Sequence, residues 1–250
     1  PIQSELGRQI RKAFIPADGC VLLTADYSQI ELRIMAHLSG DEHLKAAFQK
    51  GGDVHRETAS KIFRVPPEDV SSKQRDRAKV INFGIIYGMG PRRLGREFGI
   101  STKEASAFID NYFDIYAEVR NFLGKTIEQA KVDGYVTTLL GRIRYLPELQ
   151  SHQRSVQSFG ERIAVNTPVQ GTAADMIKRA MVNLHQRLSD EGSGAAMIIQ
   201  VHDELVLEIP EDEVEMVATI VCEEMENAIE LDVPLVVEVG WGGNWMEAKP

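Results

Sequence analysis

The chain has 250 residues, of which 43% are hydrophobic and 26% charged, and its formal net charge is −9. These values are ordinary for a soluble globular protein, and the length allows one large domain or two closely associated subdomains. No stretch of about 18 apolar residues occurs, which excludes a membrane-spanning helix. Cys20 and Cys222 lie in unrelated contexts, so we expect reduced thiols and a cytoplasmic protein.

The charge is unevenly distributed along the chain. An acidic total counts against simple nucleic-acid binding, which usually requires a basic surplus. Residues 204–230, however, carry ten Asp and Glu and no Lys or Arg, whereas residues 61–103 are rich in Lys and Arg. A local basic face is therefore compatible with the acidic total.

The first third of the chain predicts one short strand followed by helices. Residues 20–26 are typical of a buried strand that ends in a carboxylate. The pattern becomes helical over 30–48. A further helix is expected to begin at an N-cap, either Ser71 or Ser72, and to stop at Gly88.

The middle of the chain is predicted to be mostly helical. One or two amphipathic helices are expected over 101–131, followed by a small irregular or hairpin element over 134–146. A long helix is expected over 151–187, with an interruption near Pro168 and Gly171.

The last 55 residues predict strands and one packing helix. Two runs of alternating character, 196–201 and 204–209, predict a tight β-hairpin with His202-Asp203 at its tip. A helix over 211–230 and a final strand over 234–241 follow. The whole pattern favours a mixed sheet domain with a helical insertion.

The helix after Ser71 carries a chemically distinctive face. Arg75, Lys79, Phe83 and Tyr87 recur every four residues, so they share one side of the helix. Cations bind phosphates and aromatic rings stack on bases, which together predict a nucleoside triphosphate site. Alternatively, the two cations are simply solvated and the two aromatic rings pack against neighbouring side chains. A separate apolar stripe lies on the opposite side and is expected to face the core: Ala78, Ile81 and Ile85.

Carboxylates at a strand end and at a hairpin tip are a second signal. Asp26 ends the first strand, and Asp203 and Glu204 lie at the tight turn. Two carboxylates on rigid strands can hold two Mg²⁺ ions for phosphoryl displacement. A turn aspartate and a helix cap are the alternative, because the sequence does not show that these positions meet in space.

A third signal is a polar face on the long helix. Arg162, Asn166 and Gln170 repeat every four residues. Such a face could donate hydrogen bonds to the acceptors on the minor-groove edge of a duplex, and it could equally be an ordinary solvent-exposed face.

Several motifs together resemble those of family A DNA polymerases. The matching segments are DYSQIELR at 26–33, the Arg-Lys-Phe-Tyr helix at 75–87, NTPVQGTAADMIKRAM at 166–181 and VHDE at 201–204. They occur in the order of that family, and the likeness covers essentially the whole chain. The fold this implies is α+β: a right-hand polymerase palm, an antiparallel sheet with packing helices, with a mostly helical fingers insertion.

The resemblance also implies a domain organisation. The palm would comprise residues 1–39 and 151–250, and the fingers residues 40–150. We expect the chain to be part of a larger DNA polymerase I, without its thumb and exonuclease-like domains. The missing segment would act in cis or as a separate chain, and no membrane is expected to be involved.

The resemblance assigns template-directed DNA synthesis to these residues. Asp26 and Asp203, with the Tyr27 carbonyl, would hold two Mg²⁺ ions, for which Mn²⁺ can substitute. Lys79 would donate a proton to pyrophosphate, and Glu204 would be an auxiliary acid.

The same likeness implies contacts to the nucleotide and to DNA. The dNTP contacts would be Arg75, Lys79, Phe83, Tyr87, His55, Gln29 and Glu31, with Glu31 and Tyr87 excluding a 2′-hydroxyl and Phe83 implying discrimination against dideoxynucleotides. The primer–template contacts would be Arg162, Asn166, Gln170 and His202.

Three other functions remain open at this point. A single-subunit RNA polymerase would share much of the chemistry, although Glu31 and Tyr87 disfavour it. A non-catalytic DNA-binding or scaffolding module would be expected to lose Asp26, Asp203 or Lys79, and the chain retains all three. A metal-dependent phosphohydrolase does not require the basic–aromatic helix.

Overall fold

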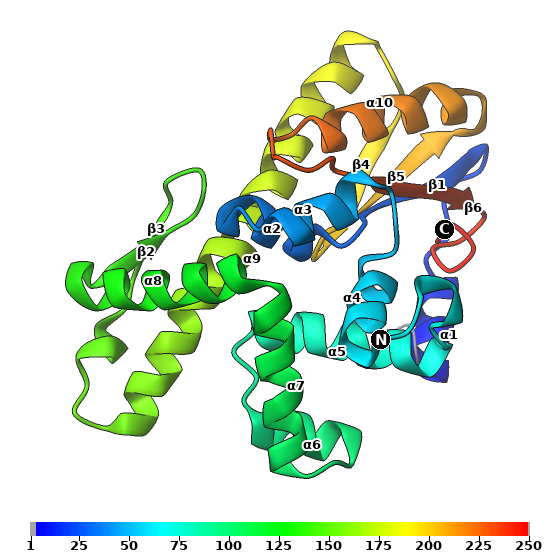
Figure 1. Cartoon of the computed structure of the whole chain (residues 1–250). Helices are drawn as coiled ribbons and strands as arrows, with labels where there is room; N and C mark the ends of the chain where they lie inside the picture. The colour runs from blue at the N-terminus through cyan, green and yellow to red at the C-terminus, as the bar shows by residue number, and fades with distance from the viewer. Residues whose placement is uncertain (1–3, 250) are drawn as a thin grey trace. The chain divides into compact units, whose positions relative to one another are not determined.

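The computed structural model describes residues 4–249, which form two compact units (Figure 1). Unit one contains residues 4–30, 173–230 and 235–249, and unit two contains residues 31–172 and 231–234. Within the described residues, no helix is both long and apolar enough to cross a bilayer.

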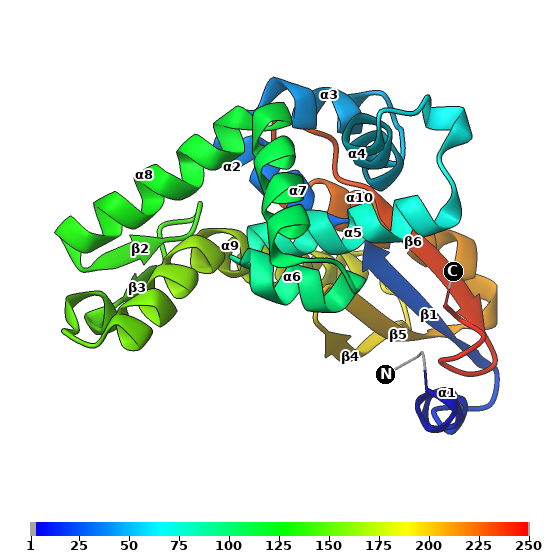
Figure 2. The same cartoon turned by 60° about the horizontal axis from the view of Figure 1, so that its bottom comes forward.

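Unit one is built on a four-stranded sheet, visible face-on in Figure 2. The strands are β1 (Cys20–Tyr27), β4 (Ala196–Val201), β5 (Glu204–Pro210) and β6 (Val237–Gly242), in the order β4-β5-β1-β6. Each neighbouring pair is antiparallel, as the resemblance implies. The central strand β1 owes its place to its apolar residues, since Leu22, Leu23 and Ala25 are fully buried.

Helices complete unit one. The helix α1 (Glu5–Lys12) begins at the N-cap Ser4, and α10 (Val214–Glu226) follows the 3₁₀ turn η3 (Glu211–Glu213) and packs against β1 and β6. The predicted hairpin of β4 and β5 is confirmed, with His202-Asp203 between its strands.

Unit two is predominantly helical. Its elements are α2 (Ile30–Ser39), α3 (Glu42–Gln49), α4 (Val54–Phe63), η1 (Pro67–Asp69), α5 (Ser72–Ile86), α6 (Pro91–Phe98), α7 (Thr102–Ile115), α8 (Ala117–Asp133), the hairpin β2 (Tyr135–Thr137) and β3 (Ile143–Tyr145), η2 (Pro147–Gln150) and the first half of α9 (Arg154–Asp190). Two predicted starts are confirmed as capping boxes, at Ser71 for α5 and at Ser101 for α7.

The sequence did not predict α6. Its signals are present all the same: Pro91 stands at its first turn, and Gly99 ends it with a φ of 64°. The helix is only eight residues long, which leaves a weak periodic signal.

The predicted interruption of α9 is wrong, because the helix runs without a break through Pro168. Just beyond the proline, Thr172 connects α9 to the β2–β3 hairpin. The hydroxyl of Thr172 donates to the Pro168 carbonyl at 2.5 Å and accepts the Leu139 N–H at 2.9 Å. Gly171 has a packing role instead: a Cβ there would meet Thr138 Cγ2 at 2.5 Å.

Replacing Gly171 by Ala should therefore lower the free energy of unfolding by about 1–3 kcal/mol, the usual cost of overpacking. Urea unfolding measures this. Adding Thr138→Ser removes the clashing methyl group, keeps the hydroxyl that accepts the Arg142 N–H at 3.1 Å, and should restore most of the loss.

The matched control is Gly124→Ala in α8, where an added Cβ meets nothing within 4 Å. That change should stabilise the protein by about 0.5–1 kcal/mol, because glycine is a poor helix former. Equal stability changes for Gly171→Ala and Gly124→Ala would contradict the packing argument.

Candidate active site

The structure brings the predicted carboxylates of unit one together. Strand β1 pairs with β5 so that Asp26 lies directly opposite Glu204. At the same edge the Tyr27 N–H donates to the Asp203 carbonyl at 3.2 Å. Antiparallel pairing thus places three carboxylates from distant parts of the sequence at one end of two adjacent strands.

The backbone beside these carboxylates adopts an unusual conformation. Gln29 and His202 have φ values of 56° and 54°, in the left-handed region that non-glycine residues rarely occupy. In addition, the buried Oε1 of Gln29 has no hydrogen-bond partner within the described residues. Strained backbone and an unsatisfied buried acceptor are both frequent at functional sites.

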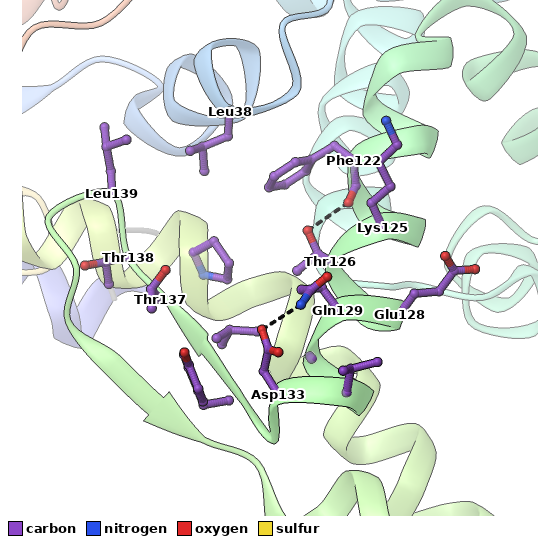
Figure 3. A pocket seen from close by; sticks show the side chains of 15 residues that line it. Leu38, Phe122, Lys125, Thr126, Glu128, Gln129, Asp133, Thr137, Thr138 and Leu139 are labelled. Carbon is purple, nitrogen blue, oxygen red and sulfur yellow. Dashed lines mark hydrogen bonds between the residues drawn. The ribbon is translucent and has the colours of Figure 1, made fainter.

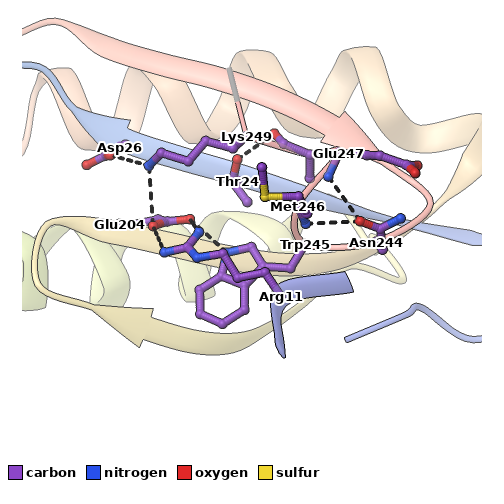
Figure 4. A network of polar contacts seen from close by, with 10 residues as sticks. Arg11, Thr24, Asp26, Glu204, Asn244, Trp245, Met246, Glu247 and Lys249 are labelled. Carbon is purple, nitrogen blue, oxygen red and sulfur yellow. Dashed lines mark hydrogen bonds and ion pairs between the residues drawn. The ribbon is translucent and has the colours of Figure 1, made fainter. Parts of the chain in front are cut away.

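Cations and an indole surround Asp26 and Glu204 (Figure 4). Lys249 Nζ lies 2.9 Å from Asp26 Oδ2, and Trp245 Nε1 donates to Glu204 Oε1 at 2.8 Å. The Arg11 guanidinium donates to both oxygens of Glu204, at 3.3 Å each. Burial alone would raise the pKa of Glu204, but these hydrogen bonds and cations outweigh it and hold the pKa below its usual value.

The carboxylate cluster fits a magnesium site in its chemistry. Asp26, Asp203 and the Tyr27 carbonyl offer the hard oxygen ligands that Mg²⁺ prefers. Within residues 4–249, no group of three or more His, Cys, Asp and Glu side chains is arranged to hold a metal. Two carboxylates are nevertheless sufficient, since Mg²⁺ usually retains several waters and takes further ligands from substrate phosphates.

In unit two, the four-residue repeat of α5 forms one face of the helix. Lys79 is exposed, and Arg75, Phe83 and Tyr87 are partly exposed. The predicted apolar stripe is buried on the other side, where Ala78 belongs to a cluster with Ala59 of α4 and with Val70. This packing confirms the predicted orientation of α5.

Side chains of the α5 face are held by specific partners. Arg75 pairs with Asp53, the N-cap of α4. The Phe83 and Tyr87 rings are stacked, with centroids 6.5 Å apart, and the Tyr87 hydroxyl donates to Glu31. A cation, two stacked rings and a carboxylate thus succeed one another along this face.

His55 is less accessible than the sequence suggests. Its side chain is 2% exposed, and its Nδ1 lies 3.0 Å from the Asn82 amide nitrogen. Burial lowers the pKa of His55 from 6.5 to about 4; Asp53 opposes this shift, and the cations Arg75 and Lys79 add to it. The ring is therefore neutral, and a contact to phosphate would use an Nε2–H donor.

This pKa shift predicts a pH-dependent stability. Between about pH 6.5 and 4 the unfolded chain protonates His55 while the folded protein does not, so stability falls as the pH falls. Allowing for partial solvent screening, we expect a loss of about 2 kcal/mol over this window that His55→Gln lacks. Unfolding free energies at pH 7 and pH 4.5 measure it. His152→Gln, at an exposed histidine, should keep the full loss, and an identical loss in His55→Gln would contradict the argument.

The polar face of α9 also lies within unit two. Arg162 and Gln170 are exposed, and the buried Oδ1 of Asn166 has no hydrogen-bond partner in the described part of the chain. Arg162 approaches the end of α5 closely, since a Cβ on Gly88 would meet Arg162 Cγ at 3.2 Å. Two of the three sequence signals are thus adjacent in this unit.

A cavity of about 750 Å³ in unit two is separate from all these residues (Figure 3). It lies between α8 and the β2–β3 hairpin, and Phe122, Val136 and Leu139 are among its apolar lining residues. No predicted site residue lines it. Cavity volume alone would therefore have pointed away from the residues that the sequence predicts for the site.

Sequence reasoning missed several residues that hold the predicted ones. These are Arg11, Trp245 and Lys249 around the carboxylates, and Asp53 and Asn82 on the α5 side. Asp53 had a detectable signal, because an aspartate before a helical run is a typical N-cap. The others carry no local signal, since their partners are far away in the sequence.

Known proteins with similar sequences and structures bear on this arrangement. DNA polymerase I, thermostable, from Thermus aquaticus is 52% identical over the whole chain, and DNA polymerase I from Geobacillus stearothermophilus is 47% identical. The chain spans 30% and 28% of those two proteins, respectively. A solved structure, the POL domain of Pol1 from M. smegmatis in complex with DNA primer-template and dNTP, matches with a TM-score of 0.96 and 47% identity, over 99% of this chain and 44% of that one. The model of DNA polymerase family A matches residues 1–247, and the chain therefore belongs to that family.

Proposed function

We propose that the chain catalyses template-directed DNA synthesis: it transfers a deoxynucleotide from a dNTP to a primer 3′-hydroxyl and releases pyrophosphate. The observation that carries this proposal is the pairing of β1 with β5, which gathers Asp26, Asp203 and Glu204 at one edge of the sheet. A carboxylate cluster of this kind suits in-line phosphoryl transfer.

Family A DNA polymerases are generally metal-dependent. We propose two Mg²⁺ ions here, replaceable by Mn²⁺, with Asp26, Asp203 and the Tyr27 carbonyl as protein ligands. When bound there, the ions would lower the pKa of the primer 3′-hydroxyl and neutralise negative charge on the leaving pyrophosphate. Glu204 is an auxiliary acid in this scheme, since its own oxygens are bound by Arg11 and Trp245.

On the nucleotide side, the α5 face receives the dNTP. Arg75 and Lys79 bind the triphosphate, and the exposed Lys79 ammonium donates the proton that the departing pyrophosphate takes up. Donors for further phosphate contacts are the Nε2–H groups of Gln29 and the Nε2–H of the neutral His55 ring. Arg75 pairs with Asp53 through Nε, and its guanidinium has further N–H donors for phosphate.

The aromatic half of the same face selects the sugar and base. Phe83 packs against the incoming sugar and base, and Tyr87 stacks at the templating position. The hydrogen bond from Tyr87 to Glu31 closes the space that a 2′-hydroxyl would need, which favours deoxynucleotides.

The remaining polar residues contact primer–template DNA. Arg162, Asn166 and Gln170 suit the minor-groove acceptors, and His202 lies at the hairpin tip beside Asp203. We assign residues 1–39 and 151–250 to a palm and residues 40–150 to fingers. The free thiols of Cys20 and Cys222 support a cytoplasmic location.

Sugar selectivity tests this function against that of an RNA polymerase. The assay extends a labelled primer on a DNA template with Mg²⁺ and either dNTPs or rNTPs, at protein concentrations that saturate the DNA. We expect extension with dNTPs and little with rNTPs. Preferential use of rNTPs would overturn the proposal.

A further inference from the structure

Lys249 lies directly on the carboxylates at the edge of the sheet (Figure 4). Its Nζ is 2.9 Å from Asp26 Oδ2 and 3.5 Å from Glu204 Oε2. The side chains of Lys249 and Asp26 are only 26% and 27% exposed, so water screens this pair incompletely. One ammonium thus bridges the two carboxylates that the β1–β5 register places opposite each other.

The end of the chain is fixed so that Lys249 reaches this position. The buried Thr24 hydroxyl of β1 donates to the Ala248 carbonyl at 2.6 Å. Three residues before Ala248, the Trp245 N–H donates to the Phe14 carbonyl at 3.0 Å, and the Trp245 ring packs edge-on against the Phe14 ring. These contacts of Trp245 and Ala248, which lead directly to Lys249, hold this segment against β1.

The partners of the two carboxylates differ. Glu204 also accepts hydrogen bonds from Arg11 and Trp245, and the Arg11 guanidinium lies 4.1 Å over the Trp245 ring. Glu204 therefore keeps well-placed donors if Lys249 moves. Asp26, by contrast, forms its ion pair with Lys249.

We propose that Lys249 is a placeholder cation: it neutralises Asp26 and Glu204 before a divalent ion binds, and it gives up Asp26 when the ion arrives. This inference rests on the proposed function, in which Asp26 is a metal ligand. The Asp26 oxygen that Lys249 occupies cannot also carry a divalent ion at bonding distance, because the two cations would repel each other strongly. The flexible lysine stem lets Nζ shift toward Glu204 Oε2, which is already 3.5 Å away.

Two consequences distinguish this role from a structural one. Lys249 competes with the metal, so removing its charge should strengthen metal binding. It also offsets repulsion between adjacent carboxylates, so removing it should destabilise the metal-free protein. A residue that only supported the fold would not raise metal affinity when lost.

The test measures Mn²⁺ binding to the whole chain without DNA, by the electron paramagnetic resonance signal of free Mn²⁺. Lys249→Met keeps the length of the side chain and removes its charge. We expect it to bind Mn²⁺ about three- to tenfold more tightly than the wild type, as the loss of one competing ion pair implies. Lys249→Arg keeps the charge and should stay within about twofold of the wild type. Lys12→Met removes an exposed lysine of α1 and should also change the affinity less than twofold, about what a distant surface charge contributes.

A stability measurement accompanies the binding data. Without metal, Lys249→Met should melt about 2–4 °C below the wild type, and added MgCl₂ should close this gap. Unchanged or weaker Mn²⁺ binding in Lys249→Met would overturn the inference.

Asp26→Asn separates this inference from the proposed function. If Asp26→Asn abolishes Mn²⁺ binding while Lys249→Met leaves the affinity unchanged, the metal site stands and the placeholder role fails. If Mn²⁺ binding does not depend on Asp26, both the proposed metal site and the placeholder role are wrong.

Discussion

Asp203→Ala should reduce the rate of primer extension by about 10³-fold or more. The change removes one of two proposed carboxylate ligands, each worth several kcal/mol of charge stabilisation, and about 1.4 kcal/mol corresponds to tenfold in rate. The fold should survive it. The Tyr27 N–H bonds to the backbone carbonyl of residue 203, which alanine retains, and the left-handed conformation of the turn belongs to His202.

Single-turnover extension of a labelled primer by saturating protein measures this effect, and circular dichroism confirms the fold. Asp212→Ala is the matched control, because Asp212 is an exposed acid of unit one outside the carboxylate cluster. Its rate should equal that of the wild type. A wild-type rate in Asp203→Ala would refute the metal role of this residue.

Lys79→Ala should lower kcat/KM for dNTP by about 10²- to 10³-fold. The exposed ammonium on α5 is placed to neutralise triphosphate charge, and removing one such donor from a phosphoryl-transfer site typically has an effect of this size. Because Lys79 lies on the opposite side of the helix from the buried Ala78 stripe, packing is not disturbed.

The control for this experiment lies on the same helix. Lys73→Ala removes an exposed lysine near the start of α5 and should leave kcat/KM unchanged. Lys79→Arg keeps the charge and should recover part of the activity, since guanidinium also binds phosphate. If kcat/KM of Lys79→Ala stays within twofold of the wild type, Lys79 does not bind the triphosphate.

Local signals predicted much of the fold, and the exceptions have physical causes. Caps such as Ser71 and Ser101 act within one helical turn, so they are readable from the sequence. Pro168 misled the prediction because tertiary contacts hold α9 on either side of the proline, such as that of Thr172 with the β2–β3 hairpin, which lies nearby only in the folded chain. The glycine at position 171 also has a tertiary cause, because a Cβ there would clash with Thr138 of the same hairpin region.

In the candidate site, too, the features that depend on local sequence were predictable and those that depend on tertiary packing were not. The α5 face was predictable because its four residues share one helix and the helical period aligns them. The proximity of Asp26 and Asp203 was not, because it depends on the pairing of β1 with β5. Burial of His55 and the position of Lys249 likewise follow from tertiary packing, which short-range periodicity does not encode.

Incorporation of a single nucleotide opposite each of the four template bases tests the proposed function most directly. Saturating protein, Mg²⁺, a labelled primer–template and one dNTP at a time are mixed and quenched within one turnover. We expect each template base to direct addition of its Watson–Crick partner, and chelation of the metal to stop the reaction. Addition that ignores the template base, or that continues after chelation, would contradict template-directed, metal-dependent DNA synthesis by this chain.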